Sequence, residues 1–335
     1  MLRMGVSDNS KIGSCDVCDR SICLSALPRI CLFGIGIVLL ATVMLERAFA
    51  QHPPESESRW ERLGDGITEG ISGVALIEHD SAHTLLLAVH DNKSERQKRL
   101  SMIEHKPGKR AVWREVEWKS NLAPPDDRPP VDLEAICRIP GAKGEFVAGS
   151  SGGRLYRFRF VVESGEMKLI KTAEVPAKAR PPEIESFDLQ TVGGKMLVSW
   201  AGRGNGNTPA ILQWAEFDSE TLMFGMPGKA EVRAVWPVNH ARHITDLRVT
   251  PEGSVFGVAT SDPGNDGPFA SALYLLGRIK SAGQRWEFIP ANRPTRLHVS
   301  QRHKIEALEL IPGSPGGFIL GSDDENAGGA ILFAY

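Results

Sequence analysis

Cysteine is scarce in this chain of 335 residues, which contains five cysteines. Four of them lie within the first 31 positions, so Cys137 is the sole cysteine in all that follows. One thiol excludes an internal disulfide from this later part, which its hydrophobic core must therefore hold together.

An excess of charge of either sign is also lacking. The chain has 39 lysines and arginines against 41 aspartates and glutamates, for a formal net charge of −2. No basic block interrupts this balance, and the composition therefore excludes nucleic acid as a partner. Long amphipathic helical patterns are absent as well, which favours an all-β fold.

Long hydrophobic runs are limited to a single one, at 30–45. It is shorter than the roughly 20 residues that a membrane span needs. Basic residues precede it, and Ala48-Phe49-Ala50 follows as a small-residue cleavage pattern. We therefore predict a signal peptide over 1–50, cleaved before Gln51, and a flexible lead-in over 51–57. The protein is then exported, periplasmic or extracellular, without a membrane span after cleavage; an uncleaved anchor is the alternative.

A short motif with a carboxylate between apolar residues recurs after residue 58. The copies are Asp132-Leu133-Glu134-Ala135-Ile136, Glu183-Ile184-Glu185-Ser186-Phe187, His243-Ile244-Thr245-Asp246-Leu247 and Lys304-Ile305-Glu306-Ala307-Leu308. A degenerate copy, Ile71-Ser72-Gly73-Val74-Ala75, lacks the acid. Repeats of this length, each rich in short strand patterns, are typical of a β-propeller.

Four strand patterns follow each copy, except the last, which has three before the chain ends. We predict one β-propeller over 58–335 with five blades, six being the alternative. Arg59-Trp60-Glu61 resembles Arg285-Trp286-Glu287 in an outer strand. We therefore expect 58–63 to supply the missing strand and to close the ring, which removes the exposed sheet edges.

The repeat predicts where chemistry would lie. The first strand of each blade lines the central channel, so the motif acids should gather at one mouth. The candidate metal ligands are Glu134, Glu185, Asp246 and Glu306, with Asp323 and Asp324 from a nearby turn. Oxygen ligands alone suit Ca²⁺ or Mg²⁺.

An alternative neutralises the acids without a metal. An arginine precedes each acid, and these arginines could pair with the acids and lock neighbouring blades together: Arg128, Arg180, Arg242 and Arg302. His243 and His303 lie near the predicted ring and are candidates for a general base or a ligand.

Two segments carry a family resemblance. They are 132–136 followed by 146–148, and 304–308 followed by 321–329. They resemble the signature of bacterial exported propellers labelled esterase-like or phytase-like. The resemblance implies a propeller, an exported location and a bound divalent cation.

Three functions are compatible with these features. One is metal-dependent hydrolysis of an ester or phosphoester, with Ca²⁺ as cofactor and Arg242 or Arg302 neutralising the anion. Another is a non-enzymatic propeller that binds a small anionic ligand or a protein partner at the channel mouth. The third is a structural propeller without a small ligand.

Overall fold

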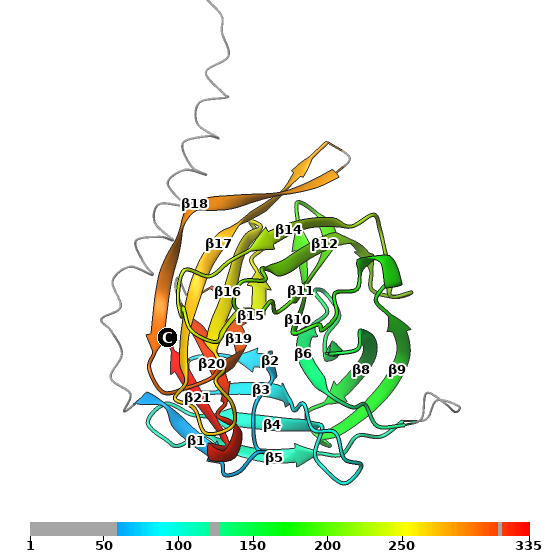
Figure 1. Cartoon of the computed structure of the whole chain (residues 1–335). Coiled ribbons are helices and arrows are strands. Elements are labelled where there is room, and N and C mark those ends of the chain that lie inside the picture. Colours follow the sequence, from blue (N-terminus) through cyan, green and yellow to red (C-terminus); the bar gives the residue numbers. More distant parts are fainter. Residues whose placement is uncertain (1–58, 121–127, 284, 314–316) are drawn as a thin grey trace, which may run out of the picture. The chain divides into compact units, whose positions relative to one another are not determined.

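A computed structural model describes residues 59–120, 128–283, 285–313 and 317–335. The described chain forms five antiparallel sheets arranged around a common axis (Figure 1). The innermost strand of each sheet contacts that of the next, and the last contacts the first, in the order β2, β6, β10, β15, β19. The all-β propeller with five blades is thereby confirmed, and the six-bladed alternative is wrong.

Each blade runs from its inner strand to its outer strand in chain order. Blade 1 comprises β2 (Gly73–His79), β3 (Thr84–Val89), β4 (Leu100–His105) and β5 (Val112–Val116). Blade 2 comprises β6 (Leu133–Arg138), β7 (Glu145–Ser150), β8 (Arg154–Val161) and β9 (Glu166–Glu174). Blade 3 comprises β10 (Ser186–Val192), β11 (Lys195–Gly202), β12 (Ala210–Asp218), β13 (Met223–Phe224) and β14 (Gly228–Val232).

Blade 4 follows the same plan, and blade 5 departs from it in its outer strand, which comes from the beginning of the described chain. Blade 4 comprises β15 (Ala241–Val249), β16 (Ser254–Ser261), β17 (Ala270–Ala282) and β18 (Arg285–Ser300). Blade 5 comprises β19 (Ile305–Leu310), β20 (Phe318–Asp323), β21 (Gly329–Ala334) and β1 (Glu61–Gly64). Two short 3₁₀ helices, η2 (Ala177–Ala179) and η3 (Glu325–Ala327), join strands of this part of the chain. No helix among the described residues is long and apolar enough to span a membrane.

Apolar contacts between adjacent blades form the core. The second strands are largely buried, and every residue of β3, β7 and β20 is buried. Outer strands such as β9 alternate between buried and exposed residues, as expected where one sheet face meets water. The core therefore lies between the sheets.

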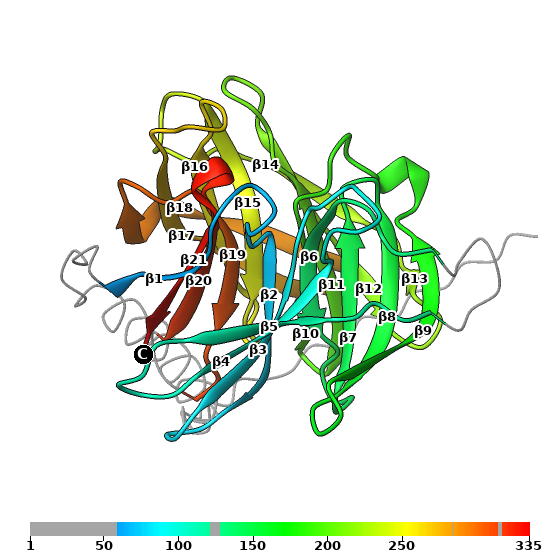
Figure 2. The ribbon, with the colours of Figure 1, turned by 90° about the horizontal axis from the view of Figure 1, so that it is seen from below.

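The ring is closed by a strand from the beginning of the described chain. β1 pairs antiparallel with β21, and Glu61 lies opposite Ile331 (Figure 2). Trp60, immediately before β1, packs against the apolar cluster that contains Phe318 and Leu332. The predicted closure by an N-terminal strand is confirmed. The predicted signal peptide and lead-in, 1–57, lie outside the described residues.

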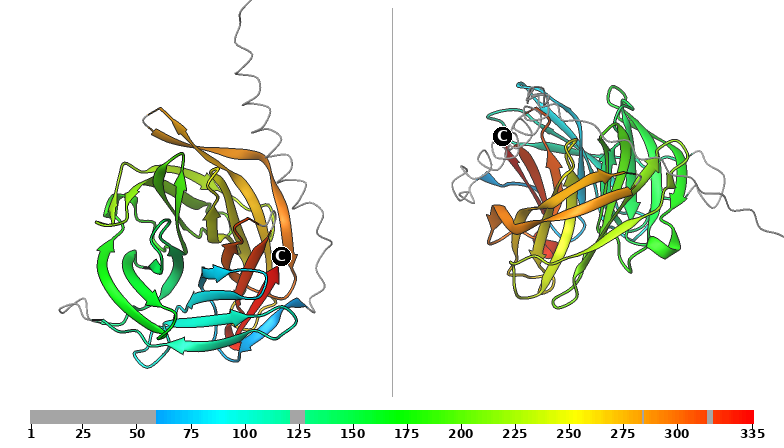
Figure 3. Two further views of the ribbon diagram at one scale, coloured as in Figure 1. Left: turned by 180° about the vertical axis from the view of Figure 1, so that it is seen from behind. Right: turned by 90° about the horizontal axis from the view of Figure 1, so that it is seen from above.

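Blades 3 and 4 differ from the prediction at their outer strands. In blade 3 the outer edge is split into β13 and β14, because Gly225-Met226-Pro227 interrupts it and proline has no N–H to donate. In blade 4, β17 and β18 extend as a long hairpin beyond the ring (Figure 3). The indole N–H of Trp286 on this hairpin donates to Glu216 of blade 3. The extension therefore ties the two blades together.

Candidate functional site

The inner strands all begin at one mouth of the channel, around a cavity of about 430 Å³. Nine carboxylate side chains line it: Asp91, Asp132, Glu134, Glu183, Glu185, Asp262, Glu306, Asp323 and Glu325. Three cationic side chains accompany them: Lys93, Arg203 and Lys304. We call this cavity the acidic mouth. Four of the six predicted ligands lie in it, namely Glu134, Glu185, Glu306 and Asp323.

A repeated backbone irregularity aims two of these acids into the channel. The pairing of β6 with β7 shifts register between Leu133 and Ala135, and that of β19 with β20 shifts between Ile305 and Ala307. The residue left over in each case is the motif acid, Glu134 or Glu306. A β-bulge leaves its extra residue out of the ladder and re-aims its side chain, which explains why the motif acid faces the channel.

Asp246 lies elsewhere, which corrects its predicted place at the mouth. It is the fourth residue of its copy, whereas the acid is third in the others, and Thr245 occupies the equivalent position. The Asp246 carboxylate accepts hydrogen bonds from the backbone N–H of Leu247 and of Leu308, both at 2.7 Å. It also pairs with Arg248 at 3.1 Å. Asp246 therefore joins blades 4 and 5 deeper in the channel.

Asp324 also lies outside the acidic mouth. It accepts hydrogen bonds from Lys304 N at 2.8 Å and Ser322 Oγ at 3.0 Å, and lies 2.6 Å from His303 Nδ1. The His303 ring stacks on Trp60, with 4.2 Å between the ring centroids. Asp324, His303 and Arg302 line a separate lateral cavity between blades 4 and 5. Through this contact with Trp60, His303 and Asp324 help to position the closing strand.

The remaining two catalytic candidates are also engaged in structural contacts. His243 Nε2 lies 2.8 Å from the carbonyl oxygen of Gly206, and Nδ1 accepts a hydrogen bond from Ala234 N at 3.3 Å. With both ring nitrogens occupied, His243 has none left to act as a general base. Arg242 donates to Asp262 at 3.0 Å and so reaches the edge of the acidic mouth.

Arg203 and Lys304 pair with motif acids of the mouth, and the upstream arginine Arg242 pairs with another acid of the mouth, Asp262. Arg180 pairs with Glu174 and Arg242 with Asp262. The partner of Glu185 is instead Arg203, at 3.5 Å. The expected pairing of Arg180 with Glu185 is therefore wrong, and Arg242 pairs with Asp262 rather than with Asp246.

Lys304 is the second neutralising cation, and its Nζ lies 3.1 Å from Glu306 Oε1 and 3.8 Å from Asp323 Oδ2. Lys304 also pairs with Glu325. Sequence reasoning missed both cations as site residues, although Lys304 opens a motif copy and Arg203 lies in a turn at the predicted mouth.

Burial raises the pKa values of three acids of the mouth. Loss of hydration raises the pKa of Glu134 well above its usual range, and the nearby Glu185 and Glu306 raise it further. Burial raises the pKa of Glu185 to about 8 although Arg203 opposes the shift. Burial likewise raises the pKa of Asp323, with Glu306 adding to the effect. The mouth therefore holds protons near neutral pH that an incoming cation could replace.

We expect the free energy of unfolding to fall as the pH rises from 6.5 to 8.5. Glu185 keeps its proton to about pH 8 in the folded protein, whereas in the unfolded chain it ionises near 4.5. The folded state thus binds more protons in this window, and stability is lost as the pH rises through the folded pKa. Urea unfolding should show a decrease on the order of 1–2 kcal/mol from Glu185 alone, and Glu185→Gln should remove that part of the decrease. An unchanged slope in this variant would contradict the assignment.

Three carboxylates of the mouth form a group that a metal ion fits. Asp91, Asp132 and Glu134 each place one oxygen within 4.8 Å of the others. Asp132 adopts a left-handed backbone conformation with φ of 62°, which is uncommon for a residue other than glycine. Lys93 Nζ lies 3.1 Å from Asp132 Oδ1, where a cation would otherwise reside. An all-oxygen set of this kind suits Ca²⁺ or Mg²⁺.

Comparisons with known proteins find similarity in fold. No family model matches the chain, and no curated protein matches it in sequence. A GH43 endo-arabinanase from Bacillus licheniformis shares 13% identity with a TM-score of 0.44, over 82% of this chain and 95% of that one. A GH32 beta-fructofuranosidase from Bombyx mori shares 15% identity with a TM-score of 0.43, over 67% of this chain. The chain spans about half of that second protein, 51% of its length.

Proposed function

We propose that the protein is an exported hydrolase whose acidic mouth binds a hard divalent cation, Ca²⁺, between Asp91, Asp132 and Glu134. One observation carries the proposal: three carboxylate oxygens lie within 4.8 Å of one another in a cavity where nine acids face three cations. Carboxylates this close repel one another unless a cation or a proton neutralises them. The substrate class is an anionic ester or phosphoester.

The residues of the mouth have distinct roles in this proposal. The bound cation would supply Lewis-acid polarisation of a substrate oxygen. Arg203 Nε has no hydrogen-bond partner among the described residues, so it is available to donate to a substrate anion. Because burial raises the pKa of Glu185 to about 8, its carboxyl group carries a proton near neutral pH. Glu185 is therefore suited to protonate the leaving oxygen as a general acid.

A second candidate function is hydrolysis of a glycosidic bond without a metal. It is favoured by a protonated carboxyl group, Glu185, that shares the mouth with Asp132, which pairs with Lys93 at 3.1 Å. A carboxylic acid that can donate a proton, with a second carboxyl group at the same site, is what glycoside hydrolysis needs.

Calcium is expected to raise the melting temperature. At a free concentration one hundred times Kd, binding to the folded state alone adds about 2.7 kcal/mol. This corresponds to a shift of roughly 5 °C or more for a domain of this size. Differential scanning fluorimetry of the purified protein, first treated with a chelator, measures it.

Three variants test whether the calcium shift arises from the proposed ligands. Asp132→Asn and Glu134→Gln should each abolish most of the calcium shift, because each removes a ligand charge. Glu306→Gln is the matched control: Glu306 lines the same mouth but pairs with Lys304, so its calcium shift should remain. A flat titration of the unmodified protein would remove the metal, and with it the metal-dependent reaction.

Turnover should depend on the proton of Glu185. With phenyl phosphate, an anionic substrate whose leaving oxygen needs a proton, in the presence of calcium, Glu185→Gln should lower kcat by about 10²-fold. Glu95→Gln, at an exposed glutamate in the loop that follows Asp91, should leave kcat nearly unchanged. Hydrolysis of p-nitrophenyl glycosides that survives EDTA would instead support the second candidate. Calcium binding without turnover of any of these substrates would indicate a binding protein.

A further inference from the structure

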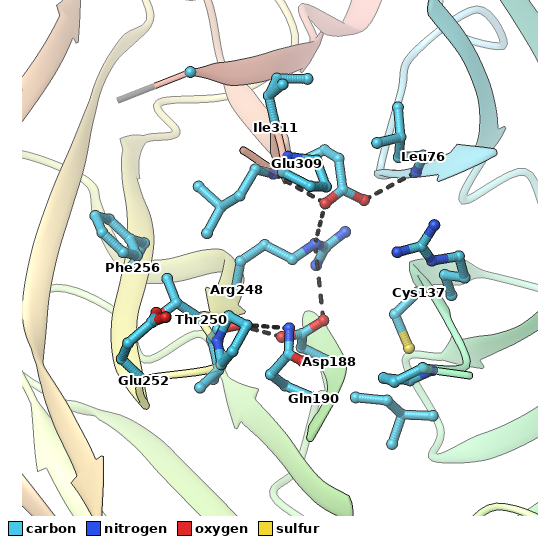
Figure 4. A pocket seen from close by; sticks show the side chains of 18 of the residues that line it. Leu76, Cys137, Asp188, Gln190, Arg248, Thr250, Glu252, Phe256, Glu309 and Ile311 are labelled. Atoms are coloured by element: carbon cyan, nitrogen blue, oxygen red, sulfur yellow. Dashed lines mark hydrogen bonds and ion pairs between the residues drawn. The ribbon is translucent and has the colours of Figure 1, made fainter. Parts of the chain in front are cut away.

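A second cavity, of about 490 Å³, lies at the opposite end of the channel, where the inner strands end. Its walls are largely apolar and include Leu76, Leu189, Phe256 and Ile311, with Cys137 at one side (Figure 4). We call it the distal cavity. Its size falls within the range typical of small-molecule pockets, and such pockets combine apolar walls with a few placed polar groups.

The polar groups at its floor surround Arg248, whose side chain is only 4% exposed. The two terminal nitrogens of the guanidinium donate four hydrogen bonds, to Asp246 Oδ1 at 3.1 Å, Leu247 O at 2.7 Å, Val74 O at 2.6 Å and Ile136 O at 3.0 Å. The third nitrogen, Nε, has no hydrogen-bond partner in the part of the chain that the structure describes. A buried N–H without an acceptor is costly, so this donor is a point of attachment for a ligand.

Two carboxylates flank this donor at a distance too great for direct hydrogen bonds. Asp188 Oδ1 and Glu309 Oε1 both lie 3.9 Å from Arg248 Nε, on opposite sides of the guanidinium (Figure 4). Each carboxylate already holds a backbone N–H of the next blade: Asp188 that of Val249, and Glu309 that of Leu76. Their remaining lone pairs can still accept, since an ionised carboxylate has about four acceptor sites.

The floor therefore requires a group that accepts one hydrogen bond and donates another. A hydroxyl does both: its oxygen can accept from Arg248 Nε–H while its hydrogen is donated to Asp188 or Glu309. An ammonium group only donates and cannot accept from Arg248 Nε–H, whereas a carboxylate only accepts and is repelled by the two acids. The apolar walls favour an apolar body behind this group.

We propose that the distal cavity binds a neutral small molecule that carries a hydroxyl group on an apolar body. The hydroxyl bridges Arg248 to the flanking carboxylates, and the body packs against Leu76, Phe256 and Ile311. This site is separate from the acidic mouth, and the proposal does not depend on the reaction assigned to that mouth.

Benzyl alcohol, benzylamine and benzoate test the proposal as a matched series that differs in the head group. Titration of the unmodified protein at pH 7, followed by backbone amide NMR shifts, should show saturable binding of the alcohol. The shifts should centre on Cys137, Gln190 and Thr250, which line the distal cavity, and leave Arg203 unmoved. The amine and the acid should bind at least tenfold more weakly.

A pair of Glu→Gln variants locates the head group. Glu309→Gln should weaken the alcohol at least fivefold, because a neutral amide has one acceptor oxygen in place of two and accepts a weaker hydrogen bond than a carboxylate. Glu252→Gln, an exposed residue at the rim of the same cavity, should bind the alcohol unchanged. Equal binding of all three head groups, or no saturable shift at the cavity, would overturn the proposal. The head-group series decides the question even if Glu309→Gln fails to fold.

Discussion

Replacement of Arg248 by methionine is expected to lower the free energy of unfolding by about 3–5 kcal/mol. Arg248 contacts the inner strands of all five blades. It donates to backbone carbonyls of β2 and β6, and it lies against a carboxylate from each of β10, β15 and β19. Removing the cation leaves these buried acids without a counter-charge, and it leaves two buried carbonyls without a donor.

Arg248 also affects the pKa values of the buried acids around it. Burial raises the pKa of Asp246 to about 7 and that of Asp188 to about 6, and in each case Arg248 is the main opposing influence. Without the arginine both carboxyl groups should stay protonated to higher pH. The loss of stability in Arg248→Met should therefore be greater at pH 8 than at pH 5.

Guanidinium chloride unfolding measures the effect, with Arg138→Met as the matched control. Arg138 is an exposed arginine beside the distal cavity, and its replacement should change stability by less than about 0.5 kcal/mol. The double variant Arg248→Met/Asp188→Asn should recover part of the loss, because one buried acid fewer is then uncompensated. A loss below about 1 kcal/mol in Arg248→Met would contradict the role of this residue as the centre of the ring.

The second large effect is expected from removal of β1. A chain that begins at Asp65 should lose at least about 3 kcal/mol of stability and should aggregate, because the outer edge of β21 is then unpaired. β1 also reaches blade 1: Glu61 accepts a hydrogen bond from Ala111 N, and Arg110 donates to Arg62 O at 2.9 Å. The strand therefore joins the last blade to the first.

Complementation distinguishes ring closure from general damage to the fold. A synthetic peptide of residues 59–66 should restore the melting temperature of the shortened chain by adding a strand to the free edge. A scrambled peptide of the same composition should not. A shortened chain that melts at the temperature of the whole protein would show that the ring does not need β1.

The repeat was sufficient to predict the architecture. Five motif copies predicted five inner strands, and the likeness between Trp60 and Trp286 identified the closing strand. These predictions succeeded because residues at one repeat position must lie at equivalent places around the axis. Glu134 and Glu306 were placed correctly for the same reason, although the bulges that aim them were not visible in the sequence.

The repeat could not predict details that depend on local register. Asp246 is one residue later in its copy than Glu306, and in a strand one residue reverses the side to which a side chain points. Arg248 belongs to no motif, since its importance arises from carbonyls and acids contributed by four other blades. Asp132 acquires its place beside Asp91 from a positive φ, which composition and spacing do not reveal.

The position of Arg248 also affects whether a small molecule can pass through the central channel. Arg248, which contacts all five inner strands, lies in the channel between two separate cavities, the acidic mouth and the distal cavity, which open at opposite ends. If the proposed hydrolysis takes place in the acidic mouth, its product should leave by the entrance that admitted the substrate, and occupation of the distal cavity should not obstruct its release.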